Sequence, residues 1–296
     1  MTDTALISSM QHFSTDDGDG IRTTIFMQGC NLKCAWCHNP ETIPNRSVLM
    51  FYSVRCSLCG KCESVCDFHK IKDGKHFVDF DRCVSCKKCV EVCPSGALSI
   101  SGQHMSLDEV YDFIAEDKDY YDATGGGVTF SGGEPLLQVE FLEQLAKMCT
   151  ENSIGVYVDT AANVPFDRIE KLIPYTSKFL IDLKANCEED YKKYTGGSLS
   201  TVLENIKRTI DKGADVLVRI PVIPNHNDSF AYLEKCGKLL ADCGVKNVEL
   251  LPFHRLGSGK YNAIGKEYEY EKYLPYTKKD MEKFKEVFYN EGVEVL

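Results

Sequence analysis

The apolar residues of the chain recur with two alternating periods. Six short segments, rich in β-branched residues, have the pattern of strands: residues 21–28, 127–131, 154–159, 178–184, 216–222 and 245–251. Helical spacing occurs between and after them, at residues 106–120, 139–151, 199–212, 229–242 and 278–290. Ser106 and Glu109 form a capping-box pattern, and Gly213 and Gly244 follow two of these segments as stop signals. The alternation of strand and helix predicts an α/β fold.

Six strand–helix units imply a parallel sheet, arranged either as a partial barrel or as a doubly wound sheet. A cysteine-rich segment interrupts the first strand-to-helix connection. We therefore predict a core domain made of residues 1–50 and 102–296, with a small inserted domain at residues 51–101.

Reactive and charged residues lie at or just after the end of each predicted strand, except that Arg219 lies within the fifth. The carboxyl ends of parallel strands are where α/β active sites form, so these residues are expected to converge on one site. In chain order they are Cys30, Cys34 and Cys37; Ser131 to Pro135; Asp159 and Thr160; Asp182 to Lys184; Arg219; and Pro252 to His254.

The chain has 15 cysteines, and eleven of them form three compact groups. Two groups share the CxxCxxCxxxC spacing, shifted by 27 residues, in which bacterial ferredoxins bind two 4Fe–4S clusters. In that arrangement three thiolates hold one cube and the fourth crosses to the other. The spacing predicts one cluster on Cys56, Cys59, Cys62 and Cys93, and a second on Cys66, Cys83, Cys86 and Cys89. A pair of zinc knuckles is the alternative.

The third group, Cys30, Cys34 and Cys37, has only three thiols. A 4Fe–4S cube held by three thiolates keeps one iron open for a substrate. Because His38 follows directly, a closed Cys3His zinc site is equally compatible with these residues alone.

Composition narrows the possible functions. The 296 residues carry a net charge of −10, which argues against a nucleic-acid partner. No apolar run is long enough for a membrane span, and the first residues lack a secretory signal. We expect a cytoplasmic protein, monomeric by default, in which cysteines are metal ligands rather than disulfides.

Other residues receive a plain structural interpretation. Cys149, Cys187, Cys236 and Cys243 are expected to be free thiols. The histidines at positions 12, 69, 76, 104 and 226 are expected at the surface or as caps. The tyrosine-rich stretch at residues 261–276 is expected to be a solvated amphipathic segment, with partner docking as the alternative.

Residues 17–30, DGDGIRTTIFMQGC, followed by the CxxxCxxC triplet, resemble the signature of the radical S-adenosylmethionine (SAM) activating enzymes of glycyl radical enzymes. The resemblance covers nearly the whole chain. It implies a partial (β/α)6 TIM-like barrel with a bacterial-ferredoxin-like insert, and an open-iron 4Fe–4S cluster on the triplet that is chelated by SAM. With the two insert clusters this makes three clusters.

The resemblance also implies roles for individual residues. Trp36 and His38 would pack beside SAM, Gly132 and Gly133 would approach its methionine part, and Glu134 would accept from its ammonium group. Lys184 would pair with the methionine carboxylate, Asp182 and Leu183 would lie near the nucleoside, and His254 would close over it. A monovalent cation would be held by Asp159, Thr160, the Leu180 carbonyl and Asp182.

The implied reaction is reductive cleavage of SAM to a 5′-deoxyadenosyl radical, which abstracts a Cα hydrogen from a glycine of a partner enzyme. The insert would pass electrons from a ferredoxin or flavodoxin, or would serve only as a structural staple. Two other functions stay open: a radical SAM enzyme acting on a small molecule, and a simple electron carrier.

Overall fold

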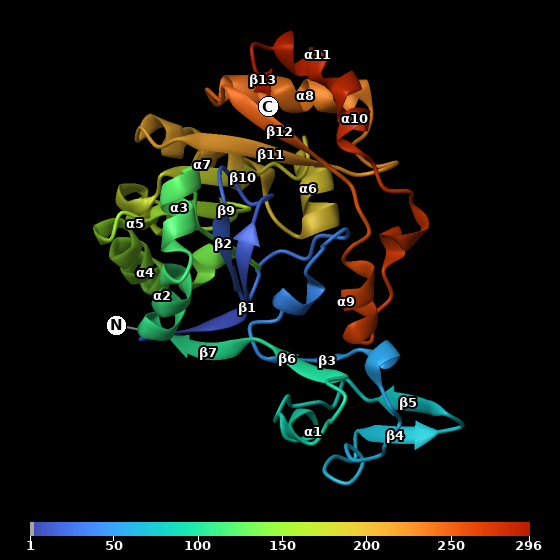
Figure 1. Ribbon diagram of the computed structural model, residues 1–296. Coiled ribbons are helices and arrows are strands. Elements are labelled where there is room, and N and C mark those ends of the chain that lie inside the picture. The colour runs from blue at the N-terminus through green and yellow to red at the C-terminus, as the bar shows by residue number, and fades with distance from the viewer. Residues whose placement is uncertain (1–2) are drawn as a thin grey trace.

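The computed structural model describes residues 3–296, which are organised around a nine-stranded sheet (Figure 1). In spatial order the strands are β13 (Glu294–Val295), β12 (Asn247–Pro252), β11 (Val216–Val222), β10 (Lys178–Asp182), β9 (Gly155–Thr160), β8 (Gly127–Gly132), β2 (Arg22–Met27), β1 (Thr4–Ser14) and β7 (Gln103–Ser106).

All six predicted strands exist, and they lie side by side in chain order from β2 to β12. Each pairs with its neighbour in parallel. A doubly wound sheet reverses its strand order at a switch point, and this run has no reversal, so that alternative is wrong. Strands β1 and β7 extend the sheet in antiparallel fashion, β13 extends it in parallel, and none of the three was predicted.

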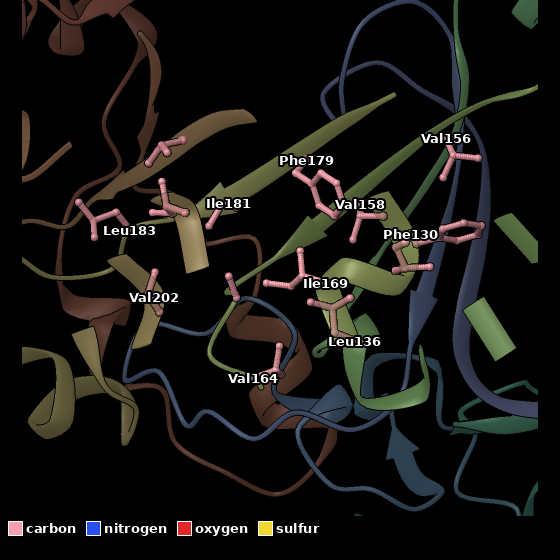
Figure 2. Close-up of a cluster of buried hydrophobic side chains, with 14 of the residues drawn as sticks. Phe130, Leu136, Val156, Val158, Val164, Ile169, Phe179, Ile181, Leu183 and Val202 are labelled. Carbon is pink, nitrogen blue, oxygen red and sulfur yellow. The ribbon is translucent and has the colours of Figure 1, made fainter. Parts of the chain in front are cut away.

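Side chains of the parallel strands alternate between two environments, as the period of a strand requires. One face carries Phe130, Val158 and Ile181, which pack with helix residues such as Ile169 in a buried cluster (Figure 2). The other face carries polar residues at the intervening positions: Thr129, Ser131, Tyr157, Asp159, Asp182, Arg219 and Glu249. The polar site residues at the strand ends therefore share one face of the sheet.

Helices of the core connect the strands (Figure 1), and all except the one at Ser258–Ala263 contribute buried residues to the apolar cluster. They are α2 (Leu107–Ala115), α3 (Lys118–Thr124), α4 (Val139–Glu151), α5 (Phe166–Leu172), α6 (Glu188–Thr195), α7 (Leu199–Asp211), α8 (Phe230–Asp242), α9 (Ser258–Ala263), α10 (Lys278–Met281) and α11 (Lys285–Tyr289). The capping box at Ser106 and Glu109 is present. No helix within residues 3–296 combines the length and the apolar character needed to cross a bilayer.

Two predicted helices are interrupted. The helix expected to run to about residue 120 ends at Ala115 and resumes at Lys118. The break lets the buried Asp117 carboxylate accept hydrogen bonds from Thr23 Oγ1 at 2.6 Å and contact His12 Nδ1 at 2.7 Å. The helix expected at residues 278–290 is likewise split, by a 3₁₀ turn at Glu282–Phe284.

The cysteine-rich segment forms its own small elements to one side of the main sheet (Figure 1). Strand β3 (Val48–Phe51) pairs with β6 (Leu98–Ser101), β4 (His69–Lys72) forms a hairpin with β5 (Lys75–Val78), and α1 spans Lys88–Glu91. The hairpin turns between Lys72 and Lys75, with Asp73 and Gly74 at positive φ. Val48 and Met50 pack against Ala263 and Ile264 at the end of α9, which joins the segment to the core.

Candidate active site

The loop after β2 carries Cys30, Cys34 and Cys37, and backbone hydrogen bonds fix it on two sides. Cys30 N donates to the Ile43 carbonyl at 3.0 Å. On the other side, Ala35 N donates to the carbonyl of Tyr194, in α6, at 2.9 Å. Burial raises the pKa of the Cys30 and Cys37 thiols to about 12, so binding of iron to these sulfurs must release their protons.

A chain of charges crosses the ends of four adjacent strands. Ser131 Oγ donates to Asp159 Oδ2 at 2.7 Å, and Asp159 pairs with Arg219. Arg219 lies beside Asp182 in register, with Nε 3.4 Å from Oδ1, and Asp182 Oδ2 accepts from Lys184 Nζ at 2.7 Å. The four charged side chains are only 9% to 18% exposed. This convergence at the strand ends is what the sequence predicted.

These contacts hold Lys184 as a cation. Burial alone would lower its pKa, but Asp182 and the nearby Cys34 raise the pKa well above the ordinary value. Burial likewise favours a neutral Asp182, yet Lys184 and Arg219 outweigh it and lower the pKa of that carboxyl. The site therefore presents a fixed ammonium group close to the thiol loop.

Glu134 is fully buried directly after the Gly132–Gly133 pair. Its Oε1 accepts from Thr160 Oγ1 at 2.6 Å and from Leu136 N at 3.1 Å, and its Oε2 accepts from Ala161 N at 3.0 Å. A carboxylate has about four lone-pair positions, so one acceptor position on Oε2 stays free for a ligand. Burial raises the pKa of Glu134 to about 7, against the lowering effect of these donors.

Glu134 is expected to make stability depend on pH. Its folded-state pKa of about 7 lies above its ordinary value of 4.5, so the folded chain binds the proton more tightly than the unfolded chain. The resulting stabilisation is complete below pH 4.5 and is lost as pH rises through about 7. We expect the free energy of unfolding of the wild type to fall across this window relative to that of Glu134→Gln. Parallel pH profiles from denaturant titrations of the two proteins would contradict the assignment.

The glycine pair allows a close backbone approach that other residues would prevent. Gly132 has φ +114°, and a Cβ there would lie 2.3 Å from Met27 N. A Cβ at Gly133 would lie 2.2 Å from the Gly29 carbonyl oxygen. Both neighbours are backbone atoms and cannot swing aside.

Gly133→Ala is therefore expected to destabilise the protein by about 1–3 kcal/mol, in the range of overpacked sites. The matched control is Gly259→Ala, because a Cβ at Gly259 would meet no atom within 4 Å. Thermal unfolding measures both. A loss in Gly133→Ala no larger than that in the control would show that the tight contact carries no cost.

An aromatic layer covers the thiol loop. Trp36 is buried with Tyr261, Tyr268 and Tyr270, which come from the tyrosine-rich stretch near the C-terminus. The three tyrosines are only 6% to 9% exposed, so the expectation that this stretch is a solvated segment is wrong at these positions. Partner docking by the stretch, the alternative, stays a prediction.

His38 and His254, from opposite ends of the sheet's parallel run, stack with ring centroids 3.9 Å apart. Burial, followed by the neighbouring His254, lowers the pKa of His38 to about 4, so His38 is neutral at pH 7. Two residues that were predicted to lie against SAM are thus in contact.

Among the buried polar atoms that have no hydrogen-bond partner within residues 3–296 are His38 Nε2 and Tyr191 OH, both near the loop. Buried polar groups are normally satisfied, so their convergence near three thiols and an ammonium group fits a polar ligand carrying acceptors and donors. Tyr191 was not predicted. It lies on α6 within a polar helical pattern, and its chemistry gives no signal that separates it from other amphipathic tyrosines.

The four residues predicted to hold a cation are neighbours, and the side chains of Asp159, Thr160 and Asp182 already have partners. Leu180 pairs with Asp159 in register, and Thr160 Oγ1 donates to Glu134. Arg219 contacts both carboxylates, Asp159 and Asp182. The guanidinium therefore already supplies the positive charge for which a cation was expected.

The insert thiols gather into two sets. Cys56, Cys59, Cys62 and Cys93 line one small pocket together with His76. Burial, together with the neighbouring thiols of Cys66, Cys83 and Cys86, raises the pKa of the Cys89 thiol to about 11, which places these four together as the other set. Cys93 and Cys66 have each crossed to the other run, which is the partition that the spacing predicted.

His69 and His76 do not have the surface roles expected for them. His69 is 1% exposed, and its Nδ1 lies 2.9 Å from His76 Nε2. Within residues 3–296, Cys62, His69 and His76 are the one set of three His, Cys, Asp or Glu ligand atoms that lie within 4.8 Å of one another. The Cys30, Cys34, Cys37 and His38 side chains do not form such a set.

Comparison with known proteins identifies the family. Residues 24–233 match the model of the radical SAM superfamily. The (2S)-3-sulfopropanediol dehydratase activating enzyme of Klebsiella oxytoca is 35% identical over 93% of this chain and 88% of its own length. The benzylsuccinate synthase activating enzyme of Thauera aromatica is 39% identical over 90% and 83%.

The 4-hydroxyphenylacetate decarboxylase activating enzyme of Clostridioides difficile is 34% identical over 97% of this chain and 94% of its own length. Among solved structures, a radical SAM methyltransferase from Sphaerobacter thermophilus superposes with a TM-score of 0.58 at 13% identity, covering 100% of this chain and 77% of its own, which shows a shared fold. Membership of the superfamily implies a 4Fe–4S cluster and SAM. The chain belongs to the radical SAM superfamily and, within it, to the activating enzymes of glycyl radical enzymes.

Proposed function

We propose that this protein installs a glycyl radical on a partner enzyme, using SAM as the radical source. The observation that carries the proposal is the meeting of three thiols, a buried cationic Lys184 and unpartnered polar atoms at the carboxyl ends of the parallel strands. The activating activity of the relatives supports it. An electron carrier that catalyses no reaction would not need a buried ammonium group and unpartnered polar atoms beside its thiols.

The roles of the chain's residues follow from their chemistry. Cys30, Cys34 and Cys37 would ligate the catalytic cluster. Lys184 would bind the SAM carboxylate, and the free acceptor position of Glu134 would receive its ammonium. Trp36, Leu183, His38 and His254 would enclose the ligand and exclude water, with Tyr191 OH as an added donor.

When bound, the cluster and SAM together supply one-electron cleavage to a 5′-deoxyadenosyl radical, which removes a glycine Cα hydrogen. The protein contributes by excluding water from the site during this reaction. The aromatic layer on Trp36 and the buried ion pairs serve this purpose by closing the site against solvent.

We propose further that residues 51–101 form a domain that holds two additional 4Fe–4S clusters and passes electrons from a ferredoxin or flavodoxin. The two gathered thiol sets support this assignment. Cys59 and Cys86 are exposed residues, which suits electron exchange with an external donor. A purely structural staple is the competing role.

Iron content tests the cluster assignment. The wild type is expected to hold about twelve irons per chain after anaerobic reconstitution, and a variant with all three triplet cysteines changed to alanine about eight. Iron and sulfide analysis measures both. Iron near four in the wild type would restrict the protein to the catalytic cluster, and iron near zero with stoichiometric zinc would overturn the whole assignment.

The function itself is tested with the reconstituted protein, SAM, a reductant and candidate glycyl radical enzymes. We expect 5′-deoxyadenosine as a product, and a glycyl radical signal in electron paramagnetic resonance (EPR) that appears only with the correct partner. SAM cleavage coupled to conversion of a small molecule, with no protein radical, would favour the alternative radical SAM function.

The monovalent cation and the monomeric state stay predictions. Because Arg219 already neutralises Asp159 and Asp182, SAM binding that is independent of sodium and potassium would argue against a cation. Size-exclusion chromatography with light scattering tests the monomer.

A further inference from the structure

The β4–β5 hairpin places His76, with His69 next to it, beside the thiols of Cys56 and Cys62. His76 Nδ1 lies 3.4 Å from Cys56 Sγ, and its Nε2 lies 3.6 Å from Cys62 Sγ. The His76 ring also packs edge to face against Phe51, with ring centroids 4.4 Å apart. His69 is buried behind it, with Nδ1 2.9 Å from His76 Nε2.

The direction of this hydrogen-bond chain follows from the acceptor. A thiolate bound to iron has no proton to give, so in a hydrogen bond between it and a ring nitrogen the nitrogen is the donor. His76 Nε2 lies closer to His69 Nδ1, at 2.9 Å, than to Cys62 Sγ, at 3.6 Å. With His69 Nδ1–H donating to Nε2, the neutral ring of His76 carries its proton on Nδ1 and donates to Cys56. If His76 is protonated, Nδ1 still donates to Cys56, and Nε2 then faces Cys62 as a second donor.

The second thiol set lacks this arrangement. The two cysteine runs are related by a shift of 27 residues, which carries position 69 to Gly96 and position 76 to Gln103. Gln103 is exposed on β7, and its Oε1 accepts from Lys87 Nζ at 3.4 Å. The hairpin thus distinguishes two otherwise duplicated sites.

Hydrogen bonds to ligand sulfurs are one of the factors that set the reduction potential of an iron–sulfur cluster. A donor draws charge from the sulfur and favours the more negative, reduced form. We propose that His76, positioned by His69, donates a hydrogen bond to the Cys56 thiolate and so raises the reduction potential of the cluster held by Cys56, Cys59, Cys62 and Cys93. The inference rests on the proposed insert clusters. It makes this cluster the more easily reduced of the two, so that an electron entering the insert resides there.

The test is an EPR-monitored redox titration of the full-length reconstituted protein. His76→Phe removes the donor and keeps a ring, while His104→Phe is the matched control, because His104 is exposed outside the pocket. We expect His76→Phe to shift the reduction equilibrium of one insert cluster about tenfold towards the oxidised form, which is about 59 mV for a one-electron couple. The control, the other insert cluster and the SAM-responsive cluster should not shift. Unchanged potentials in a fully iron-loaded His76→Phe protein would overturn the proposal.

A measurement on the wild type covers the case in which the variant does not load iron. With ¹⁵N-histidine labelling, pulsed EPR of the reduced insert cluster should show a weak nitrogen coupling, as expected through a hydrogen bond. No coupling, or a strong coupling from direct ligation, would overturn the proposal. If the triplet-cysteine variant retains no iron, the cluster assignment itself fails, which separates that failure from a failure of the histidine's role.

Discussion

Cys34→Ala is expected to abolish SAM cleavage while the insert still binds iron. Cys34 belongs to the three-thiol loop, and two thiolates do not secure a cube against loss of iron. The loop's backbone is tied to Tyr194, Thr195 and Ile43 by main-chain bonds, so the fold should survive the loss of one side chain. We expect iron content to fall by about four per chain, and 5′-deoxyadenosine to fall to the level seen without protein.

The matched control is Cys243→Ala, which makes the same chemical change at a half-buried thiol outside the three groups. It should keep full iron content and full cleavage. SAM cleavage that persists in Cys34→Ala at wild-type rate would remove the basis for placing the catalytic cluster on the triplet.

Arg219→Met is expected to cause the largest loss of folding stability among single substitutions at the site. It leaves Asp159 and Asp182 buried with one fewer cation, and breaking a buried ion pair from one side costs about 3–5 kcal/mol. The control is Lys238→Met, which removes an exposed partner of Glu234 on the surface of a helix. It should leave the denaturant concentration at the unfolding midpoint nearly unchanged. Chemical denaturation of the apoproteins measures both.

A double variant shows whether the loss comes from unbalanced charge. Asp159→Asn combined with Arg219→Met leaves Asp182 paired with Lys184, so the double variant should be more stable than Arg219→Met alone. Additive losses in the two substitutions would contradict the charge account and indicate a packing defect.

Much of the fold is readable from periodicity because the parallel core strands are buried and strongly apolar. The predicted bounds of all six strands lie within two residues of the observed bounds. Strand β1 was missed, because its alternation of exposed and buried residues lies next to polar, glycine-rich loop sequence. The split at Asp117 was also missed. The capping box and the helical spacing are local signals in the sequence. The contacts of the Asp117 carboxylate with Thr23 and His12, which accompany the split, come from strands that are distant in the sequence.

The site shows the same division. Cysteine spacing predicted the two insert sets, including the crossing of Cys66 and Cys93, because the spacing itself carries the geometry. Tyr191 and the His69–His76 pair were not predicted as site residues. Their positions depend on how α6 and the hairpin pack, and a lone tyrosine or histidine in sequence does not report what lies across from it.

The central claim is that one iron of the triplet's cluster is free to bind SAM. Electron–nuclear double resonance on the reduced protein, with SAM labelled with ¹⁵N at its amino group, measures this contact directly. A strong ¹⁵N coupling that is lost in the triplet-cysteine variant is the predicted result. A reduced triplet cluster whose spectrum does not change when labelled SAM is added would contradict the account.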